Sequence, residues 1–220
     1  LGHLVQAARA FRLAADADVR DVEARFALGT TRMALGEYGQ AVAALQTAAE
    51  LAPDRSDIRG HLGLALLASG DAAAAARAFS VTLALDPDFV EARLQLGLIQ
   101  QRRRAFAAAH ITFMTAIERA PKNARAHAYL GNVLRDMGRF VDAQRELALA
   151  RGLAPDDAEV IGNEGLAWQH AGELDRAIDC YTHAIELAPD SEPLRSSLAQ
   201  ALLLAGRFDE GWAAFEHRFM

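Results

Sequence analysis

Five prolines recur along this chain of 220 residues at a constant spacing of 34 residues. They are Pro53, Pro87, Pro121, Pro155 and Pro189. A column of glycines keeps the same spacing: Gly29, Gly63, Gly97, Gly131 and Gly165. A fixed period of this size predicts a stack of similar supersecondary units, each packed only on its neighbours, and argues against one globular core.

The stretch 124–157 shows what one unit contains. Apolar residues recur at helical spacing on both sides of Gly138, which interrupts the pattern. Pro155 ends the second helical pattern, because proline lacks an N–H and its ring clashes with the preceding turn. Each unit is therefore predicted to be two helices joined by a tight turn.

The repeated glycine lies inside the first of these helices. Glycine at such a position costs about 1 kcal/mol relative to alanine, so its recurrence in five units predicts that backbones approach closely there. The pattern resembles the tetratricopeptide repeat (TPR) family over essentially the whole chain. In the unit 124–157 the residues that carry it are Leu130, Gly131, Gly138, Phe140, Ala143, Leu147, Ala150 and Pro155.

This resemblance implies an all-α fold, a right-handed α-solenoid of stacked helix-turn-helix units. We expect one solenoid over residues 1–220, in which 1–21 is the second helix of a truncated repeat. The complete repeats are expected at 22–55, 56–89, 90–123, 124–157 and 158–191, followed by a final truncated repeat at 192–220. Because both ends interrupt a repeat, they are expected to expose apolar surface that could support self-association.

Charge and cysteine content narrow the class of partner. The net charge of −6 argues against attraction to nucleic acid or to an anionic membrane surface. No apolar run reaches the roughly 18 residues that a membrane span requires, so no membrane insertion is expected. Cys180 is the single cysteine, which excludes an internal disulfide and favours a reducing compartment. We therefore expect a cytoplasmic protein.

No pattern of residues predicts chemistry of its own. The seven histidines form no pair at the spacing of a helical metal site and are expected to lie on helix surfaces, so no metal and no cofactor is predicted. Cys180 has no neighbouring base in the sequence and is expected to be an inert thiol. The chain is accordingly predicted not to be an enzyme.

Glu164 departs from the repeat, because it stands where the other units have Leu28, Leu62, Leu96, Leu130 and Leu198. A carboxylate on a packed helix face should be paired or should escape to solvent. A contact between Glu164 and a partner is the alternative interpretation. Catalysis by this carboxylate is disfavoured, since the sequence places no second acid or base beside it.

A second departure is Arg104, which occupies the turn position held elsewhere by Gly36, Gly70, Gly138 and Gly172. With Arg102 and Arg103 it forms a short basic run at a hairpin corner. The run is expected to be a solvated turn, and a site for an acidic or phosphate-bearing partner is the alternative.

Arginines also recur at one position of the first helices, as Arg25, Arg59, Arg93 and Arg195, with His127 in the same column. One interpretation is that these side chains cover apolar surface and pair with nearby acids such as Asp54 or Asp88. The other is a ladder of cations that reads an acidic ligand.

In TPR proteins the first helices line an inner groove, and the resemblance places the candidate ligand-binding residues there. Its first half is mostly apolar and its second half is polar with arginines, which suits an extended or helical peptide with an apolar end and an acidic end. Packing between repeats is the alternative role of the leucines. The candidate groove residues are Phe26, Thr30, Met33, His61, Leu64, Leu67, Leu94, Gln95, Leu98, Gln101, Arg102, Arg125, Tyr129, Asn132, Arg135, Asn163 and Gln169, with Ser197 and Gln200 beyond them.

Two functions remain open at this point. The first is a non-enzymatic scaffold that binds a peptide or protein segment in the groove. The second is the substrate-recruiting arm of a larger bacterial transferase whose glycosyltransferase-like domain would follow residue 220. This second reading rests on a resemblance of residues 204–218 to the last repeat of such proteins, carried by Gly211, Trp212, Phe215, Glu216 and Arg218.

Overall fold

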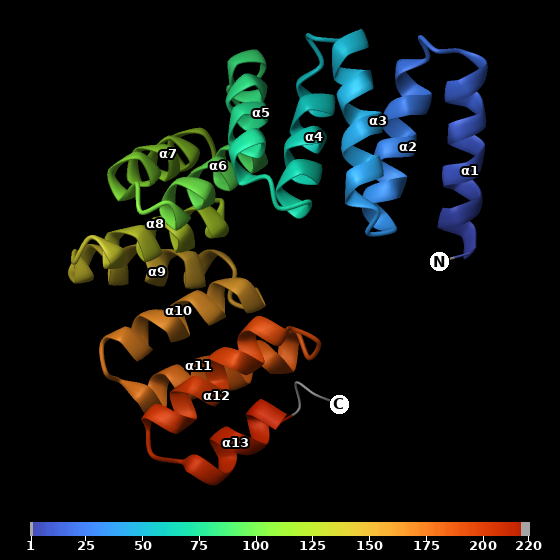
Figure 1. Cartoon of the computed structure of the whole chain (residues 1–220). Helices are drawn as coiled ribbons and strands as arrows, with labels where there is room; N and C mark the ends of the chain where they lie inside the picture. Colours follow the sequence, from blue (N-terminus) through green and yellow to red (C-terminus); the bar gives the residue numbers. More distant parts are fainter. Residues whose placement is uncertain (1, 217–220) are drawn as a thin grey trace. The chain divides into compact units, whose positions relative to one another are not determined.

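The computed structural model describes residues 2–216, and these form thirteen α-helices and no strand (Figure 1). Arg218 and the side chain of Glu216, which belong to the transferase-like signature, lie outside the described part of the chain. The helices group into two compact units, 1–102 and 103–220. The boundary falls within the predicted repeat 90–123, so the expected single solenoid stays a prediction.

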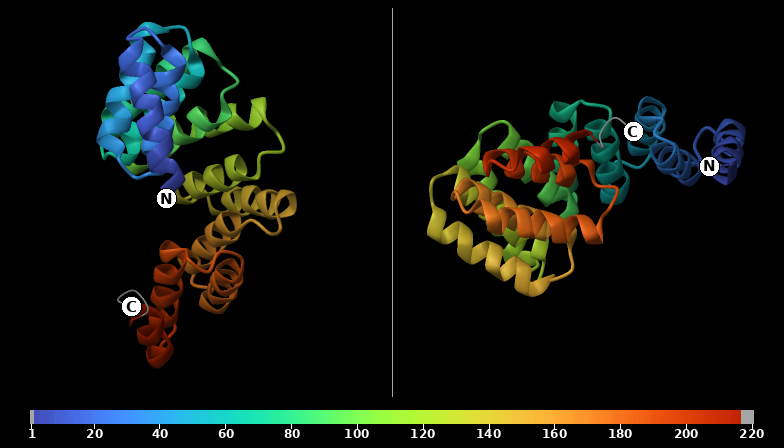
Figure 2. Two further views of the ribbon diagram at one scale, coloured as in Figure 1. Left: turned by 90° about the vertical axis from the view of Figure 1, so that its right-hand side faces the viewer. Right: turned by 90° about the horizontal axis from the view of Figure 1, so that it is seen from below.

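The first unit holds six helices and the second holds seven, joined in each by short turns (Figures 1 and 2). The helices of the first unit are α1 (Gly2–Ala17), α2 (Val22–Ala34), α3 (Tyr38–Leu51), α4 (Ser56–Ala68), α5 (Ala72–Leu85) and α6 (Val90–Arg102). Those of the second unit are α7 (Phe106–Arg119), α8 (Ala124–Asp136), α9 (Phe140–Leu153), α10 (Ala158–His170), α11 (Leu174–Leu187), α12 (Glu192–Leu204) and α13 (Phe208–Glu216).

Within each unit, helices that follow one another pack as hairpins. The pairs α2–α3, α4–α5, α8–α9, α10–α11 and α12–α13 pack closely, and the second helix of a hairpin packs on the next first helix, as α3 does on α4 and α11 on α12. The all-α class and the helix-turn-helix unit are therefore confirmed. Within the second unit α10 also contacts α8 and α12, so three first helices lie side by side.

Four of the repeated glycines, Gly29, Gly63, Gly131 and Gly165, lie where the two helices of a hairpin come close together, as their cost in a helix predicted. A Cβ added to Gly131 would lie 2.8 Å from Leu147 Cγ and 3.2 Å from the Ala143 carbonyl oxygen. The same contact recurs between Gly29 and Leu45 and between Gly63 and Phe79. Each glycine thus makes room for the bulky residue of the second helix.

The turn of each hairpin needs a left-handed residue. Gly36, Gly70, Gly138, Gly172 and Gly206 all have positive φ, between 75° and 94°. Arg104 takes the same conformation with φ of 59°, which is strained for a residue with a Cβ. The side chains of the basic run 102–104 are exposed, in agreement with a solvated turn.

The arginine column has a role that neither interpretation of the sequence foresaw. Arg59 Nε donates to the carbonyl oxygen of Pro53 at 2.9 Å, and Arg93 Nη2 donates to that of Pro87 at 2.6 Å. Arg195 bonds Pro189 in the same way, and Arg25 donates to Val19 at 3.1 Å. Each arginine therefore holds the corner between two helices through a backbone carbonyl of the loop that joins them.

His127 serves the same column in the second unit. Its Nε2 lies 3.0 Å from the carbonyl oxygen of Pro121 and its Nδ1 lies 2.7 Å from a carboxylate oxygen of Glu146. The residue is 7% exposed, so the expectation that this histidine lies on the helix surface is wrong. Its ring fills the place of the longer arginine side chain between α8 and α9.

Candidate peptide-binding site

The predicted groove residues of the first unit are mostly engaged within the unit. Leu94 is only 1% exposed, so its assignment to an open groove is wrong: it belongs to the core. Leu64 and Leu67 pack against a buried cluster that includes Phe79 of α5 and Ile99 of α6. These leucines therefore join repeats, which was the alternative role left open for them.

Aromatic and polar groove residues of the first unit are also held internally. The rings of Phe26 and His61 meet edge to face with centroids 5.0 Å apart, and the guanidinium of Arg55 lies 6.0 Å from the Phe26 centroid. Gln95 donates to Glu91 Oε1 at 2.7 Å.

Met33 packs on the cluster of Ala41, Leu45 and Ala65. Among the remaining predicted residues Thr30, Leu98 and Gln101 are half-buried and Arg102 is exposed.

In the second unit the predicted residues of α8 meet α10 through a polar network. Arg125 Nη2 donates to the Tyr129 hydroxyl at 2.9 Å, and Arg125 Nε lies 3.0 Å from Glu159 Oε2. The Tyr129 hydroxyl in turn donates to the other carboxylate oxygen of Glu159. Burial, followed by this bond to Glu159, raises the pKa of Tyr129 well above its ordinary value, so the hydroxyl keeps its proton.

A second link between α8 and α10 joins two asparagines. Asn132 Nδ2 donates to Asn163 Oδ1 at 2.8 Å, and Arg135 Nη1 donates to Asn132 Oδ1 at 3.3 Å. Arg135 also pairs with Asp136 at 2.9 Å. Three of the candidate groove residues, Asn132, Arg135 and Asn163, thus contact one another, and both arginines of this face, Arg125 and Arg135, have carboxylate partners within the chain.

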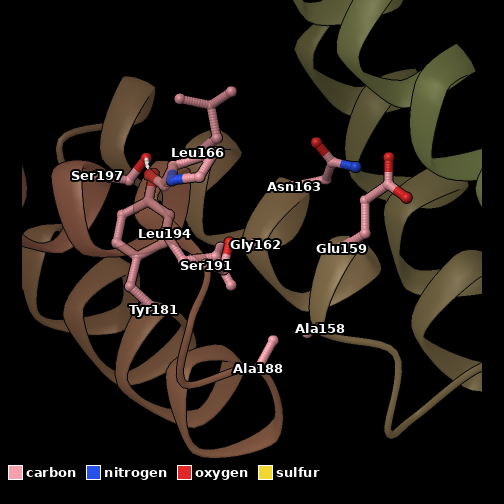
Figure 3. Close-up of a pocket in the computed structure, with 11 residues that line it drawn as sticks. Ala158, Glu159, Gly162, Asn163, Leu166, Tyr181, Ala188, Ser191, Leu194 and Ser197 are labelled. Carbon is pink, nitrogen blue, oxygen red and sulfur yellow. Dashed lines mark hydrogen bonds between the residues drawn. The ribbon is translucent and has the colours of Figure 1, made fainter. Parts of the chain in front are cut away.

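Beside this network lies a pocket of about 520 Å3 between α10 and α12 (Figure 3). Its walls are largely apolar, with Leu166, Leu194 and the ring of Tyr181 among them. Glu159 and Asn163 lie on one side of the view and Tyr181 and Ser197 on the other. The complete lining is Ala158, Glu159, Gly162, Asn163, Leu166, Tyr181, Ala188, Ser191, Pro193, Leu194 and Ser197.

One polar atom at the edge of this pocket has no partner among the described residues. Asn163 Nδ2 is buried and donates to no acceptor, although the oxygen of the same amide accepts from Asn132. A buried N–H without an acceptor is costly, so a ligand oxygen that met this N–H after a rotation of the amide would gain a hydrogen bond at little desolvation cost. The predicted residue Gln169 lies apart from the lining and accepts from the Tyr181 hydroxyl at 3.0 Å.

Most of the pocket lining was absent from the sequence prediction, which named only Asn163 and Ser197 of it. Two of these lining residues pack closely on each other: a Cβ on Gly162 would lie 2.5 Å from Leu194 Cδ2. Gly162 lies inside a helix but outside the repeated glycine column. An extra glycine at such a position was the one signal in the sequence for a local change of packing.

Comparisons with known proteins agree with the hairpin geometry. Three family models, each described as tetratricopeptide repeat, match residues 26–88 and 61–124, residues 112–145, and residues 158–191. The chain belongs to the tetratricopeptide repeat family. Proteins of this family bind protein or peptide partners and are generally non-catalytic scaffolds.

Solved TPR structures share the fold. A thermophilic TPR protein of Thermus thermophilus is 24% identical, with a TM-score of 0.70 over 83% of this chain and 99% of that chain. YrrB, described as a TPR protein with an unusual peptide-binding site, is 20% identical, with a TM-score of 0.61 over 86% and 96%. PilF of Pseudomonas aeruginosa is 16% identical, with a TM-score of 0.69 over 92% and 94%.

Comparison with curated proteins gave no match. No helix in the described part of the chain combines the length and the apolar character needed to cross a membrane.

Proposed function

We propose that this chain is a non-enzymatic interaction scaffold that binds an extended segment of a partner protein between α10 and α12. The observation that carries the proposal is the pocket of about 520 Å3 with apolar walls and one unpartnered amide, Asn163 Nδ2, at its edge. An apolar ligand side chain would fill the pocket, and a ligand main-chain carbonyl would accept from Asn163. Apolar walls with a few directed polar groups are typical of binding sites.

The charges of this site favour a neutral ligand segment. Arg125 is paired with Glu159 and Arg135 with Asp136, so neither guanidinium is uncompensated. The acidic end that the sequence suggested for the ligand is therefore not part of the proposal. The single Asn163 amide offers a directional contact without a net charge.

The test is selection of peptides from a displayed random library with the purified chain, followed by affinity measurement on two variants. Leu166→Glu places a charge in the pocket wall and is expected to weaken the selected peptide at least about tenfold, a loss of roughly 1.4 kcal/mol. Leu149→Glu makes the same change at an exposed position of α9 and serves as the control. Both variants should keep the parental circular dichroism spectrum.

Equal affinity of the parent and Leu166→Glu would refute the pocket as the binding site. Loss of helicity in Leu166→Glu alone would assign Leu166 to the core, and Ser197→Phe, which narrows the pocket from its rim, would then test the same claim. Selection of a uniformly acidic peptide would contradict the neutral ligand.

A second candidate is the recruiting arm of a transferase, favoured by the apolar surface on α12 and α13. Leu204, Phe208 and Trp212 are all more than half exposed, and they lie within residues 204–218, the segment that resembles the repeat before a catalytic domain. The coding sequence after residue 220 tests this candidate directly. A downstream α/β nucleotide-sugar domain would support it, and an adjacent stop codon would exclude it and leave Trp212 available for self-association.

A further inference from the structure

Two charged residues replace an apolar contact at the junction of α9 and α10. Elsewhere the residue near the end of a second helix shares an apolar cluster with one on the next first helix, as Ala49 does with Leu62 and Leu83 with Leu96. At the equivalent positions of α9 and α10 stand Arg151 and Glu164. The two departures from the repeat therefore face each other.

Their contact leaves the carboxylate without a hydrogen bond. Arg151 Nε lies 4.0 Å from Glu164 Oε2, which is an ion pair but too long for a hydrogen bond. The guanidinium is directed elsewhere, since its Nη2 contacts His183 Nδ1 at 3.3 Å. No described residue donates a hydrogen bond to Glu164, whose side chain is 26% exposed. Glu164 is thus paired, as expected, but through a long ion pair without a hydrogen bond.

This carboxylate lines a cleft of about 240 Å3 between the two helices. Gln144, Leu147 and Ala148 form the wall from α9, and Glu164, Ala167 and Trp168 form the wall from α10. A second cleft of about 160 Å3, which begins at Phe140, shares Gln144 and Ala167 with it. The space is large enough for one long side chain and too narrow for a helix.

We propose that this cleft docks an arginine side chain of a partner protein. A carboxylate is an acceptor that needs donors, and a guanidinium can offer two parallel N–H groups to its two oxygens. The aliphatic stem of the arginine would lie against Leu147, Ala148 and Ala167, and the guanidinium plane would lie near the Trp168 ring. The net charge of −6 draws a basic partner toward the chain.

The surface around the cleft suits a protein partner. Phe140, which lines the neighbouring cleft, is 59% exposed, and Val141 and Leu149 on the same helix are 65% and 52% exposed. Arg176 lies over the Trp168 ring with its guanidinium 4.6 Å from the centroid, so one face of this ring already packs on a cation of the chain itself. The cleft lies between α9 and α10 and is separate from the pocket between α10 and α12, so the inference goes beyond the proposed function.

The experiment uses N-acetyl-arginine N-methylamide as the probe and the full chain carrying Trp212→Phe, which leaves Trp168 as the single tryptophan. Titration followed by the NMR signal of the Trp168 indole N–H should give a saturable shift. Glu164→Gln, which removes the charge and keeps the side-chain size, is expected to weaken binding at least about tenfold. Glu186→Gln on the exposed face of α11 is the control and should bind as the parent does.

The citrulline analogue of the probe has the same shape without the charge and should not bind. Unchanged affinity in Glu164→Gln, equal binding of the citrulline analogue, or no saturable shift at about 50 mM probe would each overturn the proposal. If Glu164→Gln perturbed the fold, Glu164→Leu, which installs the residue of five other repeats, should fold and also lose the probe. Leu166→Glu, in the pocket between α10 and α12, should leave probe binding unchanged. The proposed function and the proposed arginine site can therefore be refuted separately.

Discussion

Single residues set how tightly each hairpin closes. The repeated glycines sit where a Cβ would collide with the bulky residue of the second helix, and the turn residues sit at positive φ. The two kinds of position respond in opposite ways to substitution. Adding a side chain at a packing glycine should lower the stability of the fold. Replacing a non-glycine residue at a left-handed turn position by glycine should raise it.

Gly131→Ala should lower the free energy of unfolding by roughly 1–3 kcal/mol through overpacking. Its added Cβ would lie 3.2 Å from the Ala143 carbonyl oxygen, a backbone atom that cannot rotate away. Gly152→Ala on α9 is the matched control, since a Cβ there meets nothing within 4 Å. That variant should gain about 0.5–1 kcal/mol from helix propensity. Denaturant unfolding that found both variants equally stable would contradict the close approach at Gly131.

Arg104→Gly should raise the free energy of unfolding by about 1 kcal/mol, because glycine adopts positive φ without the strain that a Cβ brings. The other described hairpin turns all use glycine at this position. Thermal or denaturant unfolding measures the difference. An Arg104→Gly protein less stable than the parent would indicate that the arginine side chain makes a contact worth more than the backbone strain.

At the scale of the helices, the arginine column is what links one hairpin to the next at its corner. The interruption of the column is as informative as its recurrence: Ile161 occupies this position in α10, where it is buried. The junction before α10 therefore lacks the carbonyl contact that Arg59 makes to Pro53 and relies on the polar links between α8 and α10.

Arg59→Met should lower the free energy of unfolding by about 1 kcal/mol, since the apolar stem is kept and the bond to the Pro53 carbonyl is lost. Arg77→Met on α5 removes an equally charged but exposed side chain and should change the stability by less than about 0.5 kcal/mol. If the two substitutions proved equivalent, the column would be a surface feature and not a link between repeats.

The helices and their hairpins could be predicted from the sequence because the same residues recur in five units, so each position can be compared between several repeats. The surroundings of a residue that departs from the repeat in one unit only could not be predicted in this way. Glu164 was recognised as anomalous, but its counterpart Arg151 became evident only when α9 and α10 were seen together. Leu94 looked like its neighbours on one helix face, yet its burial depends on packing that spacing along one helix does not describe.

The pocket between α10 and α12 illustrates the same limit. Gly162 and Leu194 lie on different repeats and outside the main glycine column, yet they contact each other and both line the cavity. The sequence predicted a site on the first helices of the repeats, and we propose the pocket between α10 and α12 as its place. A repeat pattern predicts the scaffold. The residues that depart from the pattern are where features specific to one binding surface are expected.

At the scale of the whole molecule, we propose that the second unit binds the ligand, while the leucines of the first unit serve packing. Hydrogen–deuterium exchange of the full chain with a library-selected peptide tests this assignment most directly. We predict added protection in α10 and α12, around Asn163 and Leu194, and none in α2, α4 or α6. Protection confined to the helices of the first unit would contradict it, because the ligand would then occupy a surface described here as packed.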